Sequence, residues 1–350
     1  MSRSNSRRAS LVAGVLAATL LAVTACAGSD TDSGTDQTGG ASAGAFPVTL
    51  EHKYGSTTIG KEPKRVVTVG LTDQDALLAL GVVPVATTEW LGKFPGAIGP
   101  WATAKLGGAA VPQVLTDTGS GPQFEKIAAL KPDLILSLYS GLTQESYSTL
   151  SQIAPTVAQP KKYTDYGIPW QDLTRTAGRA VGRTDQAEKA IADVEARIAE
   201  DRKANPDFEG AGGLIATTYE GYFVYGTQDP RSRVLTSLGF ELPADLDEAI
   251  GDKFGASISA ERTELLDRDA IIWLVAGIDT GRAILRKDPL YTKLDVTKEG
   301  RDVLVDEGSP YGSATSFISV LSLPYLLDRL VPQLAAAVDG DPKTPVKPVS

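Results

Sequence analysis

The feature that most constrains the fold is a run of five residues, Leu134 to Leu138, in which nearly every side chain is apolar. A strand of this kind is buried on both faces, which happens when helices cover both sides of a parallel sheet. Other short strands alternate with helical segments along the chain. The first of these helices is predicted from Asp73 to Leu80 and ends at Gly81. The predicted strands are 66–69, 82–87, 134–138, 214–218, 270–275 and 303–305. This alternation predicts an α/β protein.

Two helical segments, Trp170–Val181 and Thr184–Ala204, separate an earlier group of strands from a later one. The second segment carries an apolar stripe with helical spacing, and Thr184 is placed to cap its first turn. The stripe consists of Ala187, Ile191, Val194 and Ile198. At 1.5 Å per residue this helix spans ~30 Å. We therefore expect two α/β lobes joined by one long, stiff helix.

The N-terminus has the charge and length of a signal peptide. Arg3, Arg7 and Arg8 form a basic region, and an apolar run from Leu11 to Val23 follows it. Crossing a bilayer as a helix takes about 20 residues, so this shorter run is not expected to remain as a membrane span. Cys26 comes just after small residues, which resembles the lipobox of bacterial lipoproteins. The pattern predicts cleavage before Cys26 and a lipid anchor on that residue.

Composition excludes several kinds of chemistry. The chain has one Cys, one His and one Met, so it cannot form an internal disulfide or a zinc site of the Cys/His type. The formal net charge is −9; residues 1–25 contain three arginines and no acidic residue, so the chain after cleavage carries −12. An acidic protein is a poor candidate for binding nucleic acid. We expect no cofactor and no protein-held metal.

A β-hairpin is predicted after a flexible tether that covers residues 26–45. Phe46, Val48, Leu50, His52 and Tyr54 alternate onto one face of the hairpin. This pattern favours a packed, hydrogen-bonded role for His52 rather than metal binding.

Part of a phosphate-binding motif occurs in the same stretch. Residues 55–61 fit the GxxxxGK half, but Glu62 stands where the motif needs a hydroxyl residue, and a strand rather than a helix follows. We predict no nucleotide site there.

The predicted organisation has six parts. They are a signal peptide at 1–25, a tether at 26–45, an N-terminal α/β lobe at 46–168, connecting helices at 169–205, a C-terminal α/β lobe at 206–340 and a tail at 341–350.

Open α/β sheets bind ligands beyond the carboxyl ends of their strands, so we collected the residues that follow each strand. Aromatic side chains are concentrated there, as expected of a face that packs on a flat or bulky organic ligand. The candidate ligand-binding residues are Tyr139, Tyr219, Tyr222, Trp90, Trp101, Arg282 and Tyr311, the arginine as a partner for a carboxylate or another anionic edge.

Alternative interpretations remain open for several of these residues. Trp90 and Trp101 flank Phe94, and the three are equally consistent with a hydrophobic cluster of their own loop. Arg282 is also consistent with a solvated surface charge. Trp273 lies inside an apolar strand, which favours core packing, and Arg231 and Arg233 are interpreted as surface residues at the start of a helix.

An ordered set of motifs resembles the ferric-siderophore and cobalamin class of periplasmic binding proteins, and most closely the iron-siderophore binding lipoproteins of actinobacteria. The motifs are Pro63–Val67, Asp75–Val82, Ile127–Leu136, Ser151–Thr156, the 170–204 connector and Leu321–Tyr325, in that order over roughly residues 46–340. The resemblance implies two Rossmann-like lobes joined by one rigid helix, as in class III periplasmic binding proteins, and a monomer.

The function implied by this resemblance is the capture of ferric siderophore outside the cytoplasm and its delivery to an ABC permease, with the siderophore supplying all the iron ligands. The resemblance also implies an acidic docking residue on each lobe, for which Asp75 and Glu241 are the candidates. One alternative is a haem or cobalamin binding protein of the same fold. Another is a lipid-anchored hydrolase using paired carboxylates such as Asp245 and Asp247, and a third is an interaction scaffold without uptake.

Overall fold

The computed structural model describes residues 44–116, 121–218 and 221–341, together with 343, 344, 346, 347 and 349. One compact unit, Gly39–Ser350, contains all of them. Cys26, the signal peptide and Tyr219 lie outside the described residues.

The first lobe, which we call the N-lobe, is built on a parallel five-stranded sheet with the strand order β5-β4-β3-β6-β7. Its strands are β3 (Val66–Thr68), β4 (Ala86–Thr88), β5 (Gln113–Leu115), β6 (Leu134–Ser137) and β7 (Thr156–Ala158). The helices between them are α1 (Asp73–Ala79), η1 (Pro95–Ala97), η2 (Thr103–Leu106), α2 (Phe124–Ala129) and α3 (Gln144–Ile153). All four residues of β6 are buried, as its apolar composition predicts.

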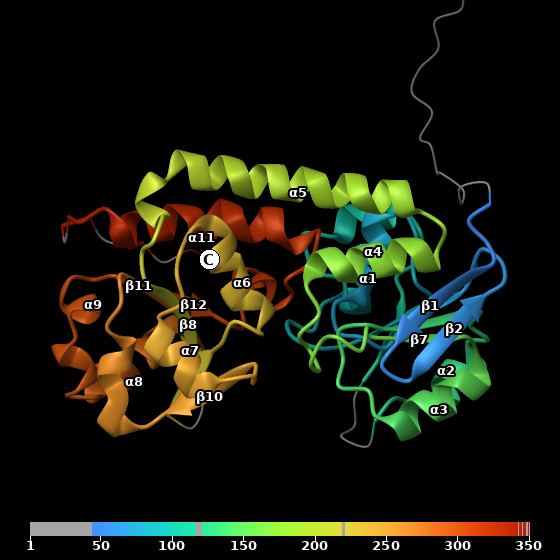
Figure 1. Cartoon of the computed structure of the whole chain (residues 1–350), viewed down its shortest axis with the longest axis horizontal. Helices are drawn as coiled ribbons and strands as arrows, with labels where there is room; N and C mark the ends of the chain where they lie inside the picture. The colour runs from blue at the N-terminus through green and yellow to red at the C-terminus, as the bar shows by residue number, and fades with distance from the viewer. Residues whose placement is uncertain are drawn as a thin grey trace, which may run out of the picture. The chain divides into compact units, whose positions relative to one another are not determined.

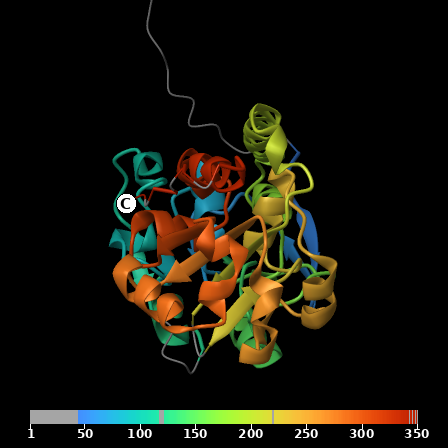
Figure 2. The ribbon, with the colours of Figure 1, turned by 90° about the vertical axis from the view of Figure 1, so that its left-hand side faces the viewer.

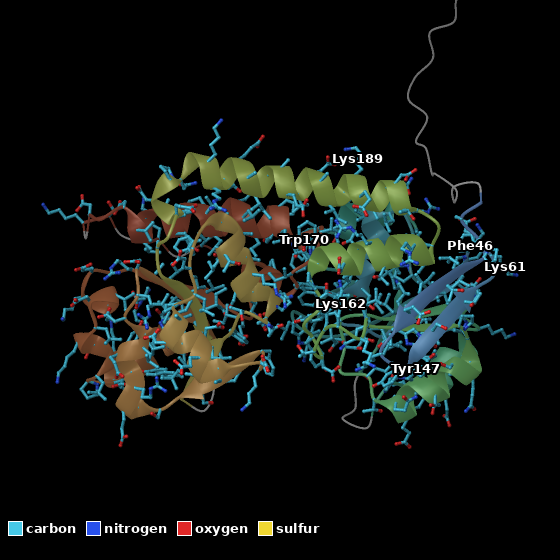
Figure 3. The ribbon with its side chains drawn as sticks, viewed as in Figure 1. Phe46, Lys61, Tyr147, Lys162, Trp170 and Lys189 are labelled. Carbon is cyan, nitrogen blue, oxygen red and sulfur yellow. The ribbon has the colours of Figure 1, made fainter. Side chains whose placement is uncertain are left out.

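A hairpin of β1 (Val48–His52) and β2 (Gly55–Ile59) packs on this lobe, with Val48 opposite Ile59. His52 is buried, its Nε2 lies 3.0 Å from the Thr57 hydroxyl, and its ring packs on Tyr147. Tyr147 lies on α3 beside the hairpin (Figure 3). The predicted structural role of His52 is confirmed. The stretch with the partial phosphate-binding motif forms β2 and does not lead into a helix.

The second lobe, the C-lobe, has a mixed sheet with the order β10-β9-β8-β11-β12. Its strands are β8 (Gly213–Thr217), β9 (Tyr222–Tyr225), β10 (Gly255–Ile258), β11 (Ala270–Val275) and β12 (Asp302–Asp306). The helices are α6 (Pro230–Leu238), α7 (Ala244–Ile250), η4 (Ala260–Leu266), α8 (Ile278–Lys287), η5 (Tyr291–Lys293), α9 (Asp295–Lys298), α10 (Pro310–Ser316) and α11 (Ser322–Val338). β8, β11 and β12 are parallel, whereas β9 runs antiparallel to β8 and to β10.

Helices α4 (Trp170–Ala180) and α5 (Thr184–Ala204) join the lobes, and η3 (Pro206–Phe208) follows them (Figure 1). The predicted stripe is the buried face of α5, which packs beside α11 (Figures 1 and 2). Thr184 is not the cap: Arg183 precedes the helix, and no side chain caps its first turn.

The sequence pattern finds five strands of the two five-stranded sheets, misplaces the start of one and misses four. β11 is present with its predicted bounds, and β3, β6, β8 and β12 lie within one residue of prediction at each end. The strand predicted at 82–87 begins only at Ala86, because Val82 donates its N–H to the Leu77 carbonyl and so closes the end of α1. Strands β5, β7, β9 and β10 have only three or four residues each and are not predicted.

Candidate functional site

A pocket of about 130 Å³ opens at the carboxyl ends of the N-lobe strands. Its walls are the ends of β3, β4, β5 and β6 and the first turns of α2 and α3. They are mostly apolar, with the hydroxyls of Thr88, Ser140, Thr143 and Ser146 among the lining groups. Leu71, Ser140 and Gly141, which the sequence places after strands β3 and β6, line this pocket.

The carboxylate of Asp73 holds two of these walls together. Asp73 begins α1 and is fully buried, and its two oxygens accept the backbone N–H groups of Leu138 at 2.7 Å and Tyr139 at 3.0 Å. Burial raises the pKa of Asp73 to about 6, although both hydrogen bonds favour the ionised form. Gly70 makes room for this carboxylate, since a Cβ atom there would lie 2.3 Å from it. The backbone of Tyr139 is therefore fixed at the edge of the pocket.

Two aromatic rings of the N-lobe pack on the Tyr139 side chain, and a ring of the C-lobe packs on one of them. Its ring centroid lies 6.0 Å from Trp90 and 5.6 Å from Tyr166, both of the N-lobe. Phe317, which follows α10 of the C-lobe, packs 4.8 Å from Trp90. Tyr139 is buried beneath these rings, and burial raises the pKa of its phenol well above the usual range. Tyr139 is thus a neutral hydrogen-bonding group within an aromatic wall.

The C-lobe adds a buried arginine to this region. Arg231 lies in the first turn of α6 and is only 9% exposed, with its guanidinium 4.3 Å from the ring centroid of Tyr225 and its Nη1 donating to Asp229 at 2.7 Å. Its Nε has no hydrogen-bond partner among the described residues. Arg233, two residues further along α6, donates to the Gly167 carbonyl at 2.7 Å, and Gly167 follows Tyr166, which packs on Tyr139. The start of α6 therefore lies beside this part of the N-lobe, where the charges of Arg231 and Asp229 act on the Tyr139 hydroxyl.

The site therefore brings together Tyr139 and Trp90 of the predicted residues, and Tyr225, Asp229 and Arg231 in addition. The interpretation of Arg231 as a surface residue is wrong, because α6 begins against the opposing lobe. A local signal for this placement exists. Asp229 and Pro230 are a helix-start pair, and Asp229 caps the helix by accepting the Arg231 N–H at 2.8 Å.

Four other predicted ligand residues lie in different surroundings. Tyr222 packs on Trp273 in the C-lobe core and donates its hydroxyl to Asp288 at 2.7 Å. The expectation of a core role for Trp273, which is fully buried, is confirmed. Tyr311 is also fully buried and donates to Gln333 at 2.7 Å, so the prediction that it contacts ligand is contradicted. The helix α10 turns this side chain under α11 rather than toward the N-lobe.

Arg282 and Trp101 also have other neighbours. Arg282 lies on α8, 3.7 Å from Asp279, and lines a surface pocket with Tyr291 and Asp302, the first residue of β12. It is therefore at the amino end of β12, away from Tyr139. Trp101 packs on Phe317 beside the aromatic wall, but its indole N–H is already bound by a carboxylate.

That carboxylate belongs to Asp75, the predicted docking residue of the N-lobe. Asp75 is fully buried, and its Oδ2 accepts Trp101 Nε1 at 2.7 Å and the Ser319 hydroxyl of the C-lobe at 2.5 Å. A docking role for Asp75 is therefore contradicted. Glu241 is exposed, but it pairs with Gly212 at the amino end of β8, on the edge of the C-lobe sheet opposite the carboxyl ends.

Comparison with known proteins assigns the family. The profile described as "Periplasmic binding protein" matches residues 66–307, more than half of the chain. The chain belongs to this family. As a periplasmic binding protein it is a substrate-binding protein rather than an enzyme, and the hydrolase hypothesis is not supported. The fold class predicted from the sequence is confirmed.

Curated relatives and solved structures agree with this assignment. The chain is 29% identical to the putative ABC transporter substrate-binding lipoprotein YhfQ of Bacillus subtilis, covering 74% of this chain and 81% of YhfQ. It is 27% identical to the Fe(3+) dicitrate-binding periplasmic protein FecB of Escherichia coli, covering 76% of this chain and 84% of FecB. A periplasmic solute binding protein from Mycobacterium smegmatis is 35% identical, with a TM-score of 0.73. This match covers 83% of this chain and 98% of the M. smegmatis protein. PiaA of Streptococcus pneumoniae, solved with ferrichrome, is 29% identical with the same TM-score and coverage.

Proposed function

We propose that this protein is the extracytoplasmic substrate-binding component of an ABC importer and that it captures iron(III) already wrapped in a siderophore. The observation that carries the proposal is the site formed by both lobes, in which Tyr139, Trp90 and Arg231 offer flat rings and hydrogen-bond donors. Among the described residues, no group of three or more His, Cys, Asp or Glu side chains could hold a metal ion. The siderophore therefore supplies the iron ligands, and the protein recognises its organic surface.

Location at the outer face of the cell membrane, through a lipid on Cys26, is part of the proposal. Support comes from the leader and lipobox pattern and from the relatives named lipoproteins. No helix among the described residues has the length and apolar character needed to cross a bilayer.

Tryptophan fluorescence tests the capture of siderophore. We expect ferric siderophores to quench the emission at sub-micromolar to micromolar concentrations, while free ferric iron does not, because the proposed site recognises the organic surface of the siderophore. Trp90→Phe should remove most of the quenching. Trp170→Phe serves as the matched control, because Trp170 lies at the start of α4 and packs in the core of the C-lobe (Figure 3). Absence of any response to hydroxamate, catecholate and carboxylate complexes, haem and cobalamin would contradict the proposal.

Docking to a permease requires acidic groups at the edge where ligand leaves, and two exposed glutamates occupy equivalent positions in the two lobes. Glu125 lies in the first turn of α2, nine residues before β6 begins, and Glu261 lies at the start of η4, nine residues before β11 begins. Both segments start at the carboxyl edge of their sheet, because Gln123 lines the N-lobe pocket and Ile258 pairs with Tyr222 beside the end of β8. We propose Glu125 and Glu261 as the docking pair.

Charge reversal tests this pair. Glu125→Lys with Glu261→Lys should abolish uptake of radioactive ferric siderophore by cells, because each would face basic groups of the permease, while the affinity of the purified protein stays unchanged. Glu241→Lys, a reversal at the opposite edge of the C-lobe sheet, is the control and should support normal uptake. Normal uptake by the double variant would exclude this docking surface.

A further inference from the structure

The charges at the site are balanced within the protein before any ligand enters. Arg231 and Asp229 form a close ion pair in which the side chains are only 10% and 3% exposed. Buried charges that are paired in this way offer little net potential to a ligand. The carboxylate of Asp229 thus offsets the one buried arginine that faces Tyr139.

A second arginine nearby has its donors committed to the protein backbone. Arg233 donates from Nε to the Thr227 carbonyl at 3.1 Å, from Nη1 to Gly167 at 2.7 Å and from Nη2 to Gln228 at 2.8 Å. These bonds hold the start of α6 against the segment before α4. Arg233 therefore acts as a structural link, and Asp229 lies close enough to act on its charge as well.

Acidic groups on the same side balance the remaining positive charge. Glu307 follows β12 and donates its N–H to the Val275 carbonyl at 2.9 Å, so it lies at the carboxyl edge of the C-lobe sheet, where its charge and that of Arg231 act on each other. Asp306 is beside it, where one carboxylate oxygen accepts the N–H groups of Gly277 and Gly308, both at 3.0 Å. Arg231 and Arg233 thus share this part of the C-lobe with Asp229, Glu307 and Asp306.

The described residues that line the N-lobe pocket include no lysine or arginine. They are apolar or carry hydroxyl and amide groups. Two surface lysines of this lobe are paired with carboxylates: Lys162 lies 2.8 Å from Asp172, and Lys53 lies 2.6 Å from Asp165. Arg282, the arginine that the sequence suggested for an anionic ligand, is at the other end of the C-lobe sheet.

We infer that the site selects ferric complexes without net negative charge, and that Asp229 and Glu307 set this selectivity. The inference rests on the proposed capture of ferric siderophores. A ferric tris-hydroxamate is neutral, because three singly charged hydroxamates balance the ferric ion, and an amine on its backbone makes it cationic. A ferric tris-catecholate keeps three negative charges, which would approach two carboxylates while the buried arginine of the site is already paired with Asp229. The guanidinium of Arg231 can still donate a hydrogen bond to an oxygen of a neutral hydroxamate complex.

The experiment measures dissociation constants of ferrichrome, ferrioxamine B, a ferric tris-catecholate and ferric citrate by tryptophan quenching. The wild-type protein should bind the best hydroxamate at least about a hundredfold more tightly than the tris-catecholate. Asp229→Asn and Glu307→Gln should each narrow this ratio by about tenfold or more, because each removes one negative charge near the ligand. Asn can keep the cap of α6, and Glu200→Gln on the exposed face of α5 controls for overall charge.

Each result has a defined meaning. Equal affinity of the wild-type protein for neutral and triply charged complexes would overturn the charge inference while leaving siderophore capture intact. The assignment of selectivity to Asp229 and Glu307 would be overturned if neither Asp229→Asn nor Glu307→Gln changed the ratio of the tris-catecholate and hydroxamate dissociation constants. This interpretation requires that both variants show normal thermal unfolding. Binding of none of the complexes would overturn the proposed function, and this inference with it.

Discussion

Replacing Arg231 by methionine is expected to weaken binding of the preferred ferric siderophore by about a hundredfold. Arg231 is the buried cation at the start of α6, beside the N-lobe, and its Nε has no hydrogen-bond partner among the described residues. A hydrogen bond from a charged donor contributes about 1.5–3 kcal/mol, and the planar guanidinium can make two at once. Methionine keeps the aliphatic packing on Tyr225 but removes every donor. Titration of tryptophan quenching or calorimetry measures the effect.

Arg231→Met also lowers the stability of the fold, so a second variant is needed to separate the effect on ligand affinity from the effect on folding. Without Arg231 the carboxylate of Asp229 stays buried and unpaired, which costs about 3–5 kcal/mol of folding free energy. The double variant Asp229→Asn with Arg231→Met removes both charges and should regain most of that stability. Its affinity should remain low. Recovery of wild-type affinity in the double variant would show that Arg231 acts only through folding and not on the ligand.

The free energy of unfolding is expected to fall as pH rises through about 6, and Asp75→Asn should remove part of this dependence. Burial raises the pKa of Asp75 to about 6, from its ordinary value of 3.8. The folded state therefore holds the proton more tightly than the unfolded state does. The resulting stabilisation is complete below the unfolded pKa and is lost as pH rises through the folded pKa. A shift of two pKa units corresponds to about 3 kcal/mol.

Urea unfolding at about pH 5 and about pH 7.5 tests this expectation. The pKa of Asp73 is also raised to about 6, and this residue is present in both the wild-type protein and Asp75→Asn. The unfolding free energy of Asp75→Asn should therefore still depend on pH, but more weakly than that of the wild-type protein. Ser319→Ala is the matched control: it removes one hydrogen bond to the carboxylate but keeps the titrating group, and so keeps the dependence. Identical pH dependence in the wild-type protein and Asp75→Asn would show that Asp75 does not titrate in the folded state in this range.

The sequence by itself determined the succession of elements and much of the core. The periodicity of apolar residues is a local property that can be recognised within a short segment of sequence. It therefore identifies the apolar runs that form β6 and β11 and the apolar stripe of α5. The same reasoning placed Tyr139 after a buried strand, because a parallel sheet presents its carboxyl ends at one edge. The ordered motifs carried the family resemblance, which the match over residues 66–307 bears out.

Only the tertiary structure decided which polar side chains share a site. Asp75 and Arg231 look like surface charges in their own segments, since nothing local shows what packs against them. Asp75 is buried by Trp101 and by Ser319, which lies 244 residues away in the sequence. Arg231 faces Tyr139 because two lobes meet there, while Arg282 follows a strand as the rule requires and still points elsewhere. Contacts between distant segments depend on how whole elements pack, and a local pattern does not record that packing.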